Sequence, residues 1–146
     1  MYLAGAKDLK LDAKARLTLP ADFRKEFDTQ VRLIPMPEAI YGFTPEGFAA
    51  WMEGIFNREY KASHPNWRRT QLALNGRCQM VEIDSAGRIA LGKVDEQARK
   101  NLGIDREVVV VGSGERFEIW NSDAWKDLNA SVTDEDLTEV MSSLDF

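Results

Sequence analysis

The chain has a single cysteine and a single histidine among its 146 residues. One cysteine excludes an internal disulfide, and with so few soft ligands a zinc cluster is not expected. We expect Cys78 to be a buried thiol. No run approaches the roughly 18 apolar residues of a membrane span, and residues 1–8 lack a basic flank followed by an apolar stretch. These absences predict a cytoplasmic protein with no metal, no cofactor and no membrane partner.

Signatures of catalysis are also missing. His64 lies in the loop-like stretch of residues 63–66, and no nucleophile and base can be assembled around it. The glycine-rich residues 112–114 lie between two predicted strands and lack the lysine and helix of a phosphate-binding loop. We therefore expect no enzymatic activity and no small-molecule substrate.

The chain has no overall excess of positive charge. Its formal net charge is −5, which at first sight argues against a nucleic-acid partner. The excess of acid is local, because five acidic and no basic residues follow residue 133, leaving residues 1–133 neutral by formal count. Residues 7–32 hold seven basic and five acidic side chains. An acidic tail thus masks a mildly basic N-terminal segment.

One short pattern occurs twice. Residues 11–19 read LDAKARLTL and residues 83–91 read IDSAGRIAL, each with an aspartate four residues before an arginine. The match continues downstream, since Arg24-Lys25 recurs as Arg99-Lys100. A repeated unit indicates one local structure used twice.

Each copy begins with the same predicted elements. Alternating apolar residues on both sides of a polar centre predict two strands that flank a tight turn within residues 8–19. Pro20 suits the first turn of a short helix, with Phe23 and Phe27 on one face. The second copy repeats this spacing, and Gly103 supplies the expected helix stop.

Each copy then predicts a hairpin followed by a helix. The clearer hairpin spans residues 107–120, and its counterpart spans residues 31–43. Amphipathic helices should begin after Thr44 and after Asn121. The tail from Ser131 reads either as a marginal helix or as a disordered segment.

These patterns divide the chain into four parts. We expect a first repeat at residues 7–53, linker helices at 54–80, a second repeat at 81–127 and an acidic C-terminal tail at 128–146.

With its paired Asp-x-x-x-Arg turns, the helix after each turn, and the run from Val108 to Trp120, the chain resembles the MraZ family of bacterial transcriptional regulators. The resemblance implies an α+β, mainly β fold. Two tandem AbrB-like repeats with flanking helices would interleave into a double-psi-like, swapped-hairpin β-barrel. Family members form rings that bind tandem repeats in double-stranded DNA. They thereby repress the division and cell-wall gene cluster, including their own gene. A nucleoid-associated homo-oligomer is therefore implied.

The resemblance also implies the DNA-binding residues, which are Arg16 and Lys14 of the first turn, Arg88 and Ser85 of the second, and more weakly Lys10 and Lys7. Three departures from the family pattern matter. Ala15 stands where the family usually has glycine, and Gly92 where it has proline. The family's basic residue near the N-terminus is replaced by Leu3-Ala4-Gly5, so we expect weaker phosphate contact there.

The turn arginines have two possible roles at this stage. A guanidinium can bind guanine O6 and N7 together or clamp a phosphate. It can instead pair with the aspartate of its own motif, so both interpretations of Arg16 and Arg88 stay open. Asp12 and Asp84 read mainly as turn-forming residues whose carboxylates accept backbone N–H groups.

A different class of function also fits. The duplicated unit could be an oligomeric protein-binding scaffold that does not bind DNA, with its acidic tail recruiting a partner. An isoelectric point near 5.0 supports this alternative. Salt dependence separates the two, because contacts to phosphates weaken steeply as salt rises and apolar packing does not.

Overall fold

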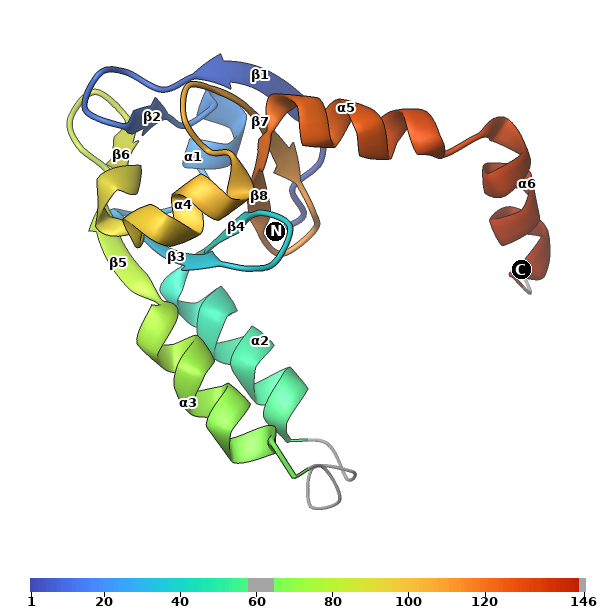
Figure 1. The fold of residues 1–146 in the computed structure, drawn as a ribbon, viewed down its shortest axis with the longest axis horizontal. Helices are drawn as coiled ribbons and strands as arrows, with labels where there is room; N and C mark the ends of the chain where they lie inside the picture. The colour runs from blue at the N-terminus through green and yellow to red at the C-terminus, as the bar shows by residue number, and fades with distance from the viewer. Residues whose placement is uncertain (58–64, 145–146) are drawn as a thin grey trace.

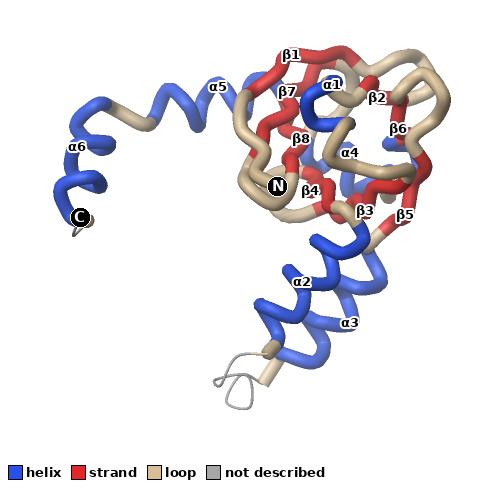
Figure 2. The backbone as a smooth tube through the Cα atoms, turned by 180° about the vertical axis from the view of Figure 1, so that it is seen from behind, coloured by secondary structure: helices blue, strands red, loops and turns tan. Residues whose placement is uncertain are grey.

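The computed structural model describes residues 1–57 and 65–144, so the interpretation of His64 lies outside the described residues (Figure 1). A β-rich body carries two projections, a pair of helices at one side and a helical arm that ends the chain (Figures 1 and 2). The described helices hold more residues than the strands. The expectation of a mainly β chain is therefore wrong by content, because the segments beyond each hairpin form long helices.

Each repeat follows the same order of elements. The first contains β1 (Ala6–Lys10), β2 (Arg16–Thr18), α1 (Ala21–Arg24), β3 (Gln30–Pro35), β4 (Ile40–Phe43) and α2 (Pro45–Phe56). The second contains β5 (Gln79–Glu82), β6 (Arg88–Ala90), the 3-10 helix η2 (Leu91–Lys93), α4 (Glu96–Leu102), β7 (Glu107–Gly112), β8 (Phe117–Asn121) and α5 (Ser122–Ser131). Helix α3 (Trp67–Arg77) precedes the second repeat, and α6 (Asp134–Ser143) forms the tail. A helix is thus what the structure shows for the tail.

The repeats exchange strands. Six strands form one antiparallel sheet in the order β1-β7-β8-β4-β3-β5, so β1 of the first repeat pairs with β7 of the second, and β5 pairs with β3. The two hairpins meet at the centre, where Ile40 of β4 lies opposite Ile119 of β8. The remaining strands, β2 and β6, pair with each other. Two strands do flank each predicted turn, but they pair with the other repeat.

The expected closed barrel is not present in the described residues. The large sheet ends at β1 and β5, and β2 and β6 form a separate two-stranded ribbon. The turn between the strands of each repeat bends the chain out of the large sheet, so the ribbon has its own ladder. The result is an open antiparallel sheet with a ribbon packed against it in an α+β fold.

The sheet separates two apolar clusters because side chains alternate along each strand. In β8, for example, Phe117 and Ile119 point to the inner core, while Glu118 and Trp120 lie on the opposite face. The inner core comprises Leu3, Leu11, Leu17, Leu19, Phe23, Phe27, Val31, Leu33, Ile40, Val81, Ile89, Leu91, Val94, Ile104, Val108, Val110, Phe117 and Ile119. The outer cluster, beneath α2 and α3, comprises Ile34, Ala39, Tyr41, Phe43, Met52, Phe56 and Leu74.

One buried carboxylate on the outer face is fully paired. Glu118 accepts hydrogen bonds from Arg116 Nε at 3.0 Å and from Trp120 Nε1 at 3.0 Å. The Arg116 guanidinium lies 4.0 Å from the centre of the Tyr41 ring. Burial, followed by the hydrogen bond that the Tyr41 hydroxyl donates to Glu38, raises the pKa of Tyr41. The cluster is therefore a structural network that joins β4 to β8.

The predicted helix starts are confirmed. The Thr44 hydroxyl accepts from the Gly47 amide at 2.9 Å, and the Asn121 side chain accepts from the Ala124 amide at 2.9 Å. Gly103 ends α4 with a left-handed φ of 67°, as the sequence predicts. Short-range signals thus set where these helices begin and end.

Candidate nucleic-acid interface

The first turn is built around one carboxylate. Asp12 Oδ1 accepts hydrogen bonds from the backbone amides of Lys14 and Arg16, both at 2.9 Å. Its other oxygen, Oδ2, lies 2.7 Å from Arg16 Nε. The aspartate therefore shapes the loop and fixes the start of the arginine side chain at the same time.

The second turn repeats this geometry. Asp84 Oδ1 accepts from the Ala86 and Arg88 amides, both at 2.9 Å, and Oδ2 lies 2.9 Å from Arg88 Nε. The prediction that both aspartates form turns is confirmed. The backbone bond from the paired arginine, helped by the ion pair, lowers the pKa of each carboxyl below its usual value. Both aspartates therefore stay ionised at neutral pH.

Each turn needs a left-handed residue just before its arginine. Gly87 has a φ of 79° and Ala15 a φ of 57°, so the first turn keeps its shape without glycine. The two turns also brace each other across the repeats. Leu91 N donates to the Ala15 carbonyl at 2.9 Å, and Leu19 N donates to the Gly87 carbonyl at 3.0 Å. These hydrogen bonds between the repeats hold Ala15 in a left-handed conformation that alanine alone disfavours.

The ribbon brings the two arginines onto one surface. Arg16 pairs with Ala90, and Arg88 pairs with Thr18. Between them, Leu17 and Ile89 point inward and are fully buried. Because side chains alternate, both arginines lie on the outer face as diagonal neighbours, roughly 7–8 Å apart on such a ladder. We call this face, with its two turns, the ribbon face (Figure 1).

The ion pairs leave most of each guanidinium available. Only Nε of Arg16 and of Arg88 is bonded to a described residue, and the side chains are 30% and 33% exposed. The two terminal NH₂ groups of each guanidinium have no hydrogen-bond partner among the described residues. The two roles left open by the sequence are thus compatible, because the aspartate orients the arginine while its terminal donors can bind a ligand.

The other predicted residues are distributed unequally. Lys14 and Ser85 are exposed in the first and second turns, next to the arginines. Lys7 and Lys10 are both exposed on β1, but they are three residues apart and therefore point to opposite faces of that strand. The fold cannot place both of them with the ribbon face.

Sequence reasoning missed Thr18. This exposed residue lies on the same side of β2 as Arg16 and directly opposite Arg88. Its hydroxyl can contact a phosphate or a base edge. The sequence does indicate that Thr18 shares a face with Arg16, because the two residues are two positions apart on a strand. Only the pairing of β2 with β6, however, places Thr18 next to both arginines.

Other chemistry is sparse in the described part of the chain. No group of three or more His, Cys, Asp or Glu side chains there is arranged to hold a metal ion. Cys78 is half-buried rather than buried, and its burial raises the pKa of the thiol. Among these residues, no helix has the length and apolar character needed to cross a bilayer.

The fold and its paired turns define an internally duplicated α+β protein with exchanged strands. Residues 76–144 match the family described as "MraZ protein, putative antitoxin-like". Proteins named "Transcriptional regulator MraZ" align over nearly the whole chain. The Neisseria meningitidis protein is 31% identical over 96% of this chain and 93% of its own length. The Neisseria gonorrhoeae protein is 32% identical over 96% and 93%. The Janthinobacterium protein is 30% identical over 97% and 98%. The chain belongs to the MraZ family.

Proposed function

We propose that the chain is a sequence-specific DNA-binding transcriptional repressor. It acts on tandem repeats upstream of the division and cell-wall gene cluster, including its own gene. The relatives named as transcriptional regulators support the general role. The observation that carries the DNA contact is the pair of guanidinium groups on the ribbon face, each held at Nε with its terminal donors available.

The chemistry of the ribbon face suits duplex DNA. Each arginine side chain is already oriented by its aspartate, so it loses little conformational entropy when it binds in a DNA groove. Its guanidinium can then bind guanine O6 and N7 together. Lys14, Ser85 and Thr18 surround the arginines and supply contacts to phosphates. A two-stranded ribbon fits the major groove. Because Lys7 and Lys10 point to opposite faces of β1, at most one of them is a secondary contact in this proposal.

Assembly supplies the affinity that one ribbon lacks. A single copy offers few phosphate contacts at cellular salt. In a ring-shaped homo-oligomer, linked ribbons bind successive repeats at a high effective concentration. The exchange of β1 and β5 between the repeats supports assignment to the AbrB-like swapped-hairpin class. We place this assembly on DNA at the nucleoid, in the cytoplasm.

Fluorescence anisotropy tests the proposal. A duplex from upstream of the gene is compared with a scrambled duplex at low and near-physiological salt. We expect Arg16→Ala to weaken specific binding by about 1–3 kcal/mol, because the bidentate contact is lost. The control is Lys100→Ala, which removes an exposed cation that pairs with Glu96 on α4. Equal binding of both duplexes, or unchanged binding by a folded Arg16→Ala variant, contradicts the proposal.

A scaffold role without DNA is the second candidate. The exposed apolar residues on α6, such as Val140 and Met141, favour it because they offer a surface for protein contact. Under this alternative the protein self-associates but binds neither duplex. The same anisotropy experiment separates the two functions.

A further inference from the structure

Helix α6 has an apolar face that no described part of the chain covers. Leu137, Val140, Met141 and Leu144 are 51%, 56%, 59% and 46% exposed. Leu137, Val140 and Met141 are three and four residues apart and form one stripe on the helix, and Leu144 follows directly after its last residue. In Figures 1 and 2, α6 lies at the end of an arm, away from the body. A helix this short has little stability in water unless its apolar face packs against something. The exposed stripe therefore indicates a binding partner.

The rest of α6 is strongly acidic. Asp134, Glu135, Asp136 and Glu139 lie on it, and the helix has no basic residue. None of these carboxylates forms an ion pair with a described residue, although Asp136 and Thr133 close the N-terminus of the helix through a capping box. A partner for this helix should therefore combine an apolar centre with positive charge.

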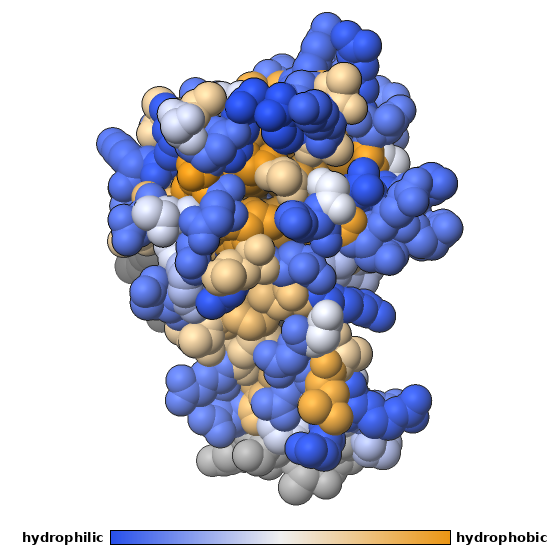
Figure 3. Space-filling view, turned by 90° about the vertical axis from the view of Figure 1, so that its left-hand side faces the viewer, coloured by the Kyte–Doolittle hydropathy of each residue, from blue (hydrophilic) through white to orange (hydrophobic). Residues whose placement is uncertain are grey.

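Helix α3 has the complementary character. It carries Arg68, Arg69 and Arg77 and no acidic residue. Within the described parts of the chain, none of the three arginines forms an ion pair. Leu72 is 56% exposed, and helical spacing places it on the same outward side as Arg68 and Gly76. Seen from the side of α3, apolar surface continues from the body onto the helical hairpin between hydrophilic side chains (Figure 3).

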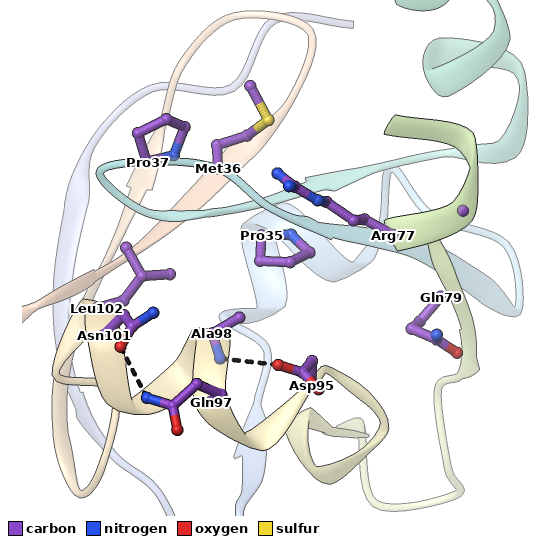
Figure 4. Close-up of a pocket in the computed structure, with 11 residues that line it drawn as sticks. Pro35, Met36, Pro37, Arg77, Gln79, Asp95, Gln97, Ala98, Asn101 and Leu102 are labelled. Atoms are coloured by element: carbon purple, nitrogen blue, oxygen red, sulfur yellow. Dashed lines mark hydrogen bonds between the residues drawn. The ribbon is translucent and has the colours of Figure 1, made fainter. Parts of the chain in front are cut away.

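A cavity extends this surface toward the body. Gly76 and Arg77 line a pocket of about 690 Å³, which is also lined by Met36 and, across from Arg77, by Ala98 and Leu102 of α4 (Figure 4). A Cβ added to Gly76 would meet no atom within 4 Å. The exposed face of α3 therefore leads from a basic end at Arg68 to a partly apolar cavity. We call this the α3 groove.

We propose that α6 of one copy docks in the α3 groove of a second copy. A parallel arrangement sets the acidic first turn of α6 against Arg68 and Arg69, and it directs Met141 and Leu144 toward the cavity. This is the helix-in-groove mode, with anchors spaced three and four residues apart. The inference rests on the self-association in the proposed function but not on DNA binding.

The occupant is a second copy because the two surfaces lie apart within one chain. The α2–α3 hairpin and the α5–α6 arm project from different sides of the body (Figures 1 and 2). Each copy then donates one helix and accepts another. Such a head-to-tail contact is heterologous, so it closes into a ring when the rotation between copies permits.

Cross-linking between separately purified variants tests the contact directly. In a Cys78→Ala background, one variant carries Leu72→Cys and the other carries Leu137→Cys. After mixing and mild oxidation, we expect a covalent pair that contains one of each. The control replaces Leu137→Cys with Leu128→Cys, an exposed leucine of the same arm. A yield of the mixed pair no higher than in the control overturns the proposal.

A charge placed in the groove tests the same contact by assembly. Gly76→Glu should raise the apparent dissociation constant of the assembly about tenfold or more, because it places a carboxylate against the apolar side chains of Met141 and Leu144. Gly54→Glu is the matched control, since a Cβ at this helical glycine of α2 also meets no atom within 4 Å. Sedimentation velocity gives the assembly state of each variant, and circular dichroism confirms that it is folded.

The outcomes separate this inference from the proposed function. Wild-type protein that stays monomeric overturns both the docking and the proposed ring. Normal assembly by Gly76→Glu overturns the docking alone. Loss of assembly by Gly76→Glu but not by Gly54→Glu, together with the mixed cross-link, supports the docking. Anisotropy with Arg16→Ala tests the DNA contact independently.

Discussion

At the scale of single residues, an Asp and an Arg four positions apart do two things at once. The carboxylate of Asp12 holds two backbone amides and the Nε of Arg16, and Asp84 does the same in the second turn. The sequence predicted the turns and the departure at Ala15. It could not show that the ion pair leaves the terminal guanidinium groups available, because that depends on which nitrogen faces the carboxylate.

The two left-handed positions should respond oppositely to substitution. Ala15→Gly removes a left-handed strain of about 1–2 kcal/mol, offset by about 0.5–1 kcal/mol of added chain entropy in the unfolded state. We expect a net stabilisation of up to about 1.5 kcal/mol. Gly87→Ala should lose about 1–3 kcal/mol, because its φ of 79° becomes strained and the new Cβ overlaps the Arg24 guanidinium. Denaturant midpoints measure both. A neutral Gly87→Ala contradicts this account of the turn.

At the scale of elements, local signals predicted what forms but not what pairs. The hairpin of β7 and β8, the caps at Thr44 and Asn121, and the stop at Gly103 all follow from neighbouring residues. The pairing of β2 with β6 joins segments about 70 residues apart, so no local pattern contains it. The position of Thr18 between two arginines depends on that pairing and was missed for this reason.

The ribbon's two ends are unequal, and the difference is testable. Lys14 of the first turn corresponds to Ala86 of the second. Both residues are exposed, so a lysine at position 86 can reach a phosphate without disturbing the turn. We expect Ala86→Lys to strengthen operator binding and to steepen the salt dependence by about one unit of slope in log K against log salt. Anisotropy titrations over a range of salt concentrations measure this.

A lysine added far from the ribbon face is the control for that substitution. Ala130→Lys adds the same charge on the exposed arm helix α5. It should change the salt slope much less than Ala86→Lys does. Equal slopes for the two variants would mean that net charge, and not the second turn, determines the effect.

At the scale of the whole molecule, strand exchange makes the two repeats one structural unit. Val31 of the first repeat pairs with Val81 of the second, and Leu9 pairs with Val108. The duplication visible in the sequence therefore does not correspond to two separable domains. The closed barrel expected from the family resemblance is wrong for the described strands, which form an open sheet and a separate two-stranded ribbon.

This exchange predicts that damage to one repeat destabilises the other equally. Val31→Ala removes fully buried methyl groups from β3, which should cost about 2–3 kcal/mol. Because β3 and β7 share one inner core and one sheet, the slowest amides of β7 and β8 should lose the same free energy of protection as those of β3 and β4. Hydrogen exchange measures each strand separately. Leu128→Ala, at an exposed leucine of α5, should leave both sets of amides unchanged. Loss of protection confined to β3 and β4 would instead mean that the repeats open independently, in spite of their exchanged strands.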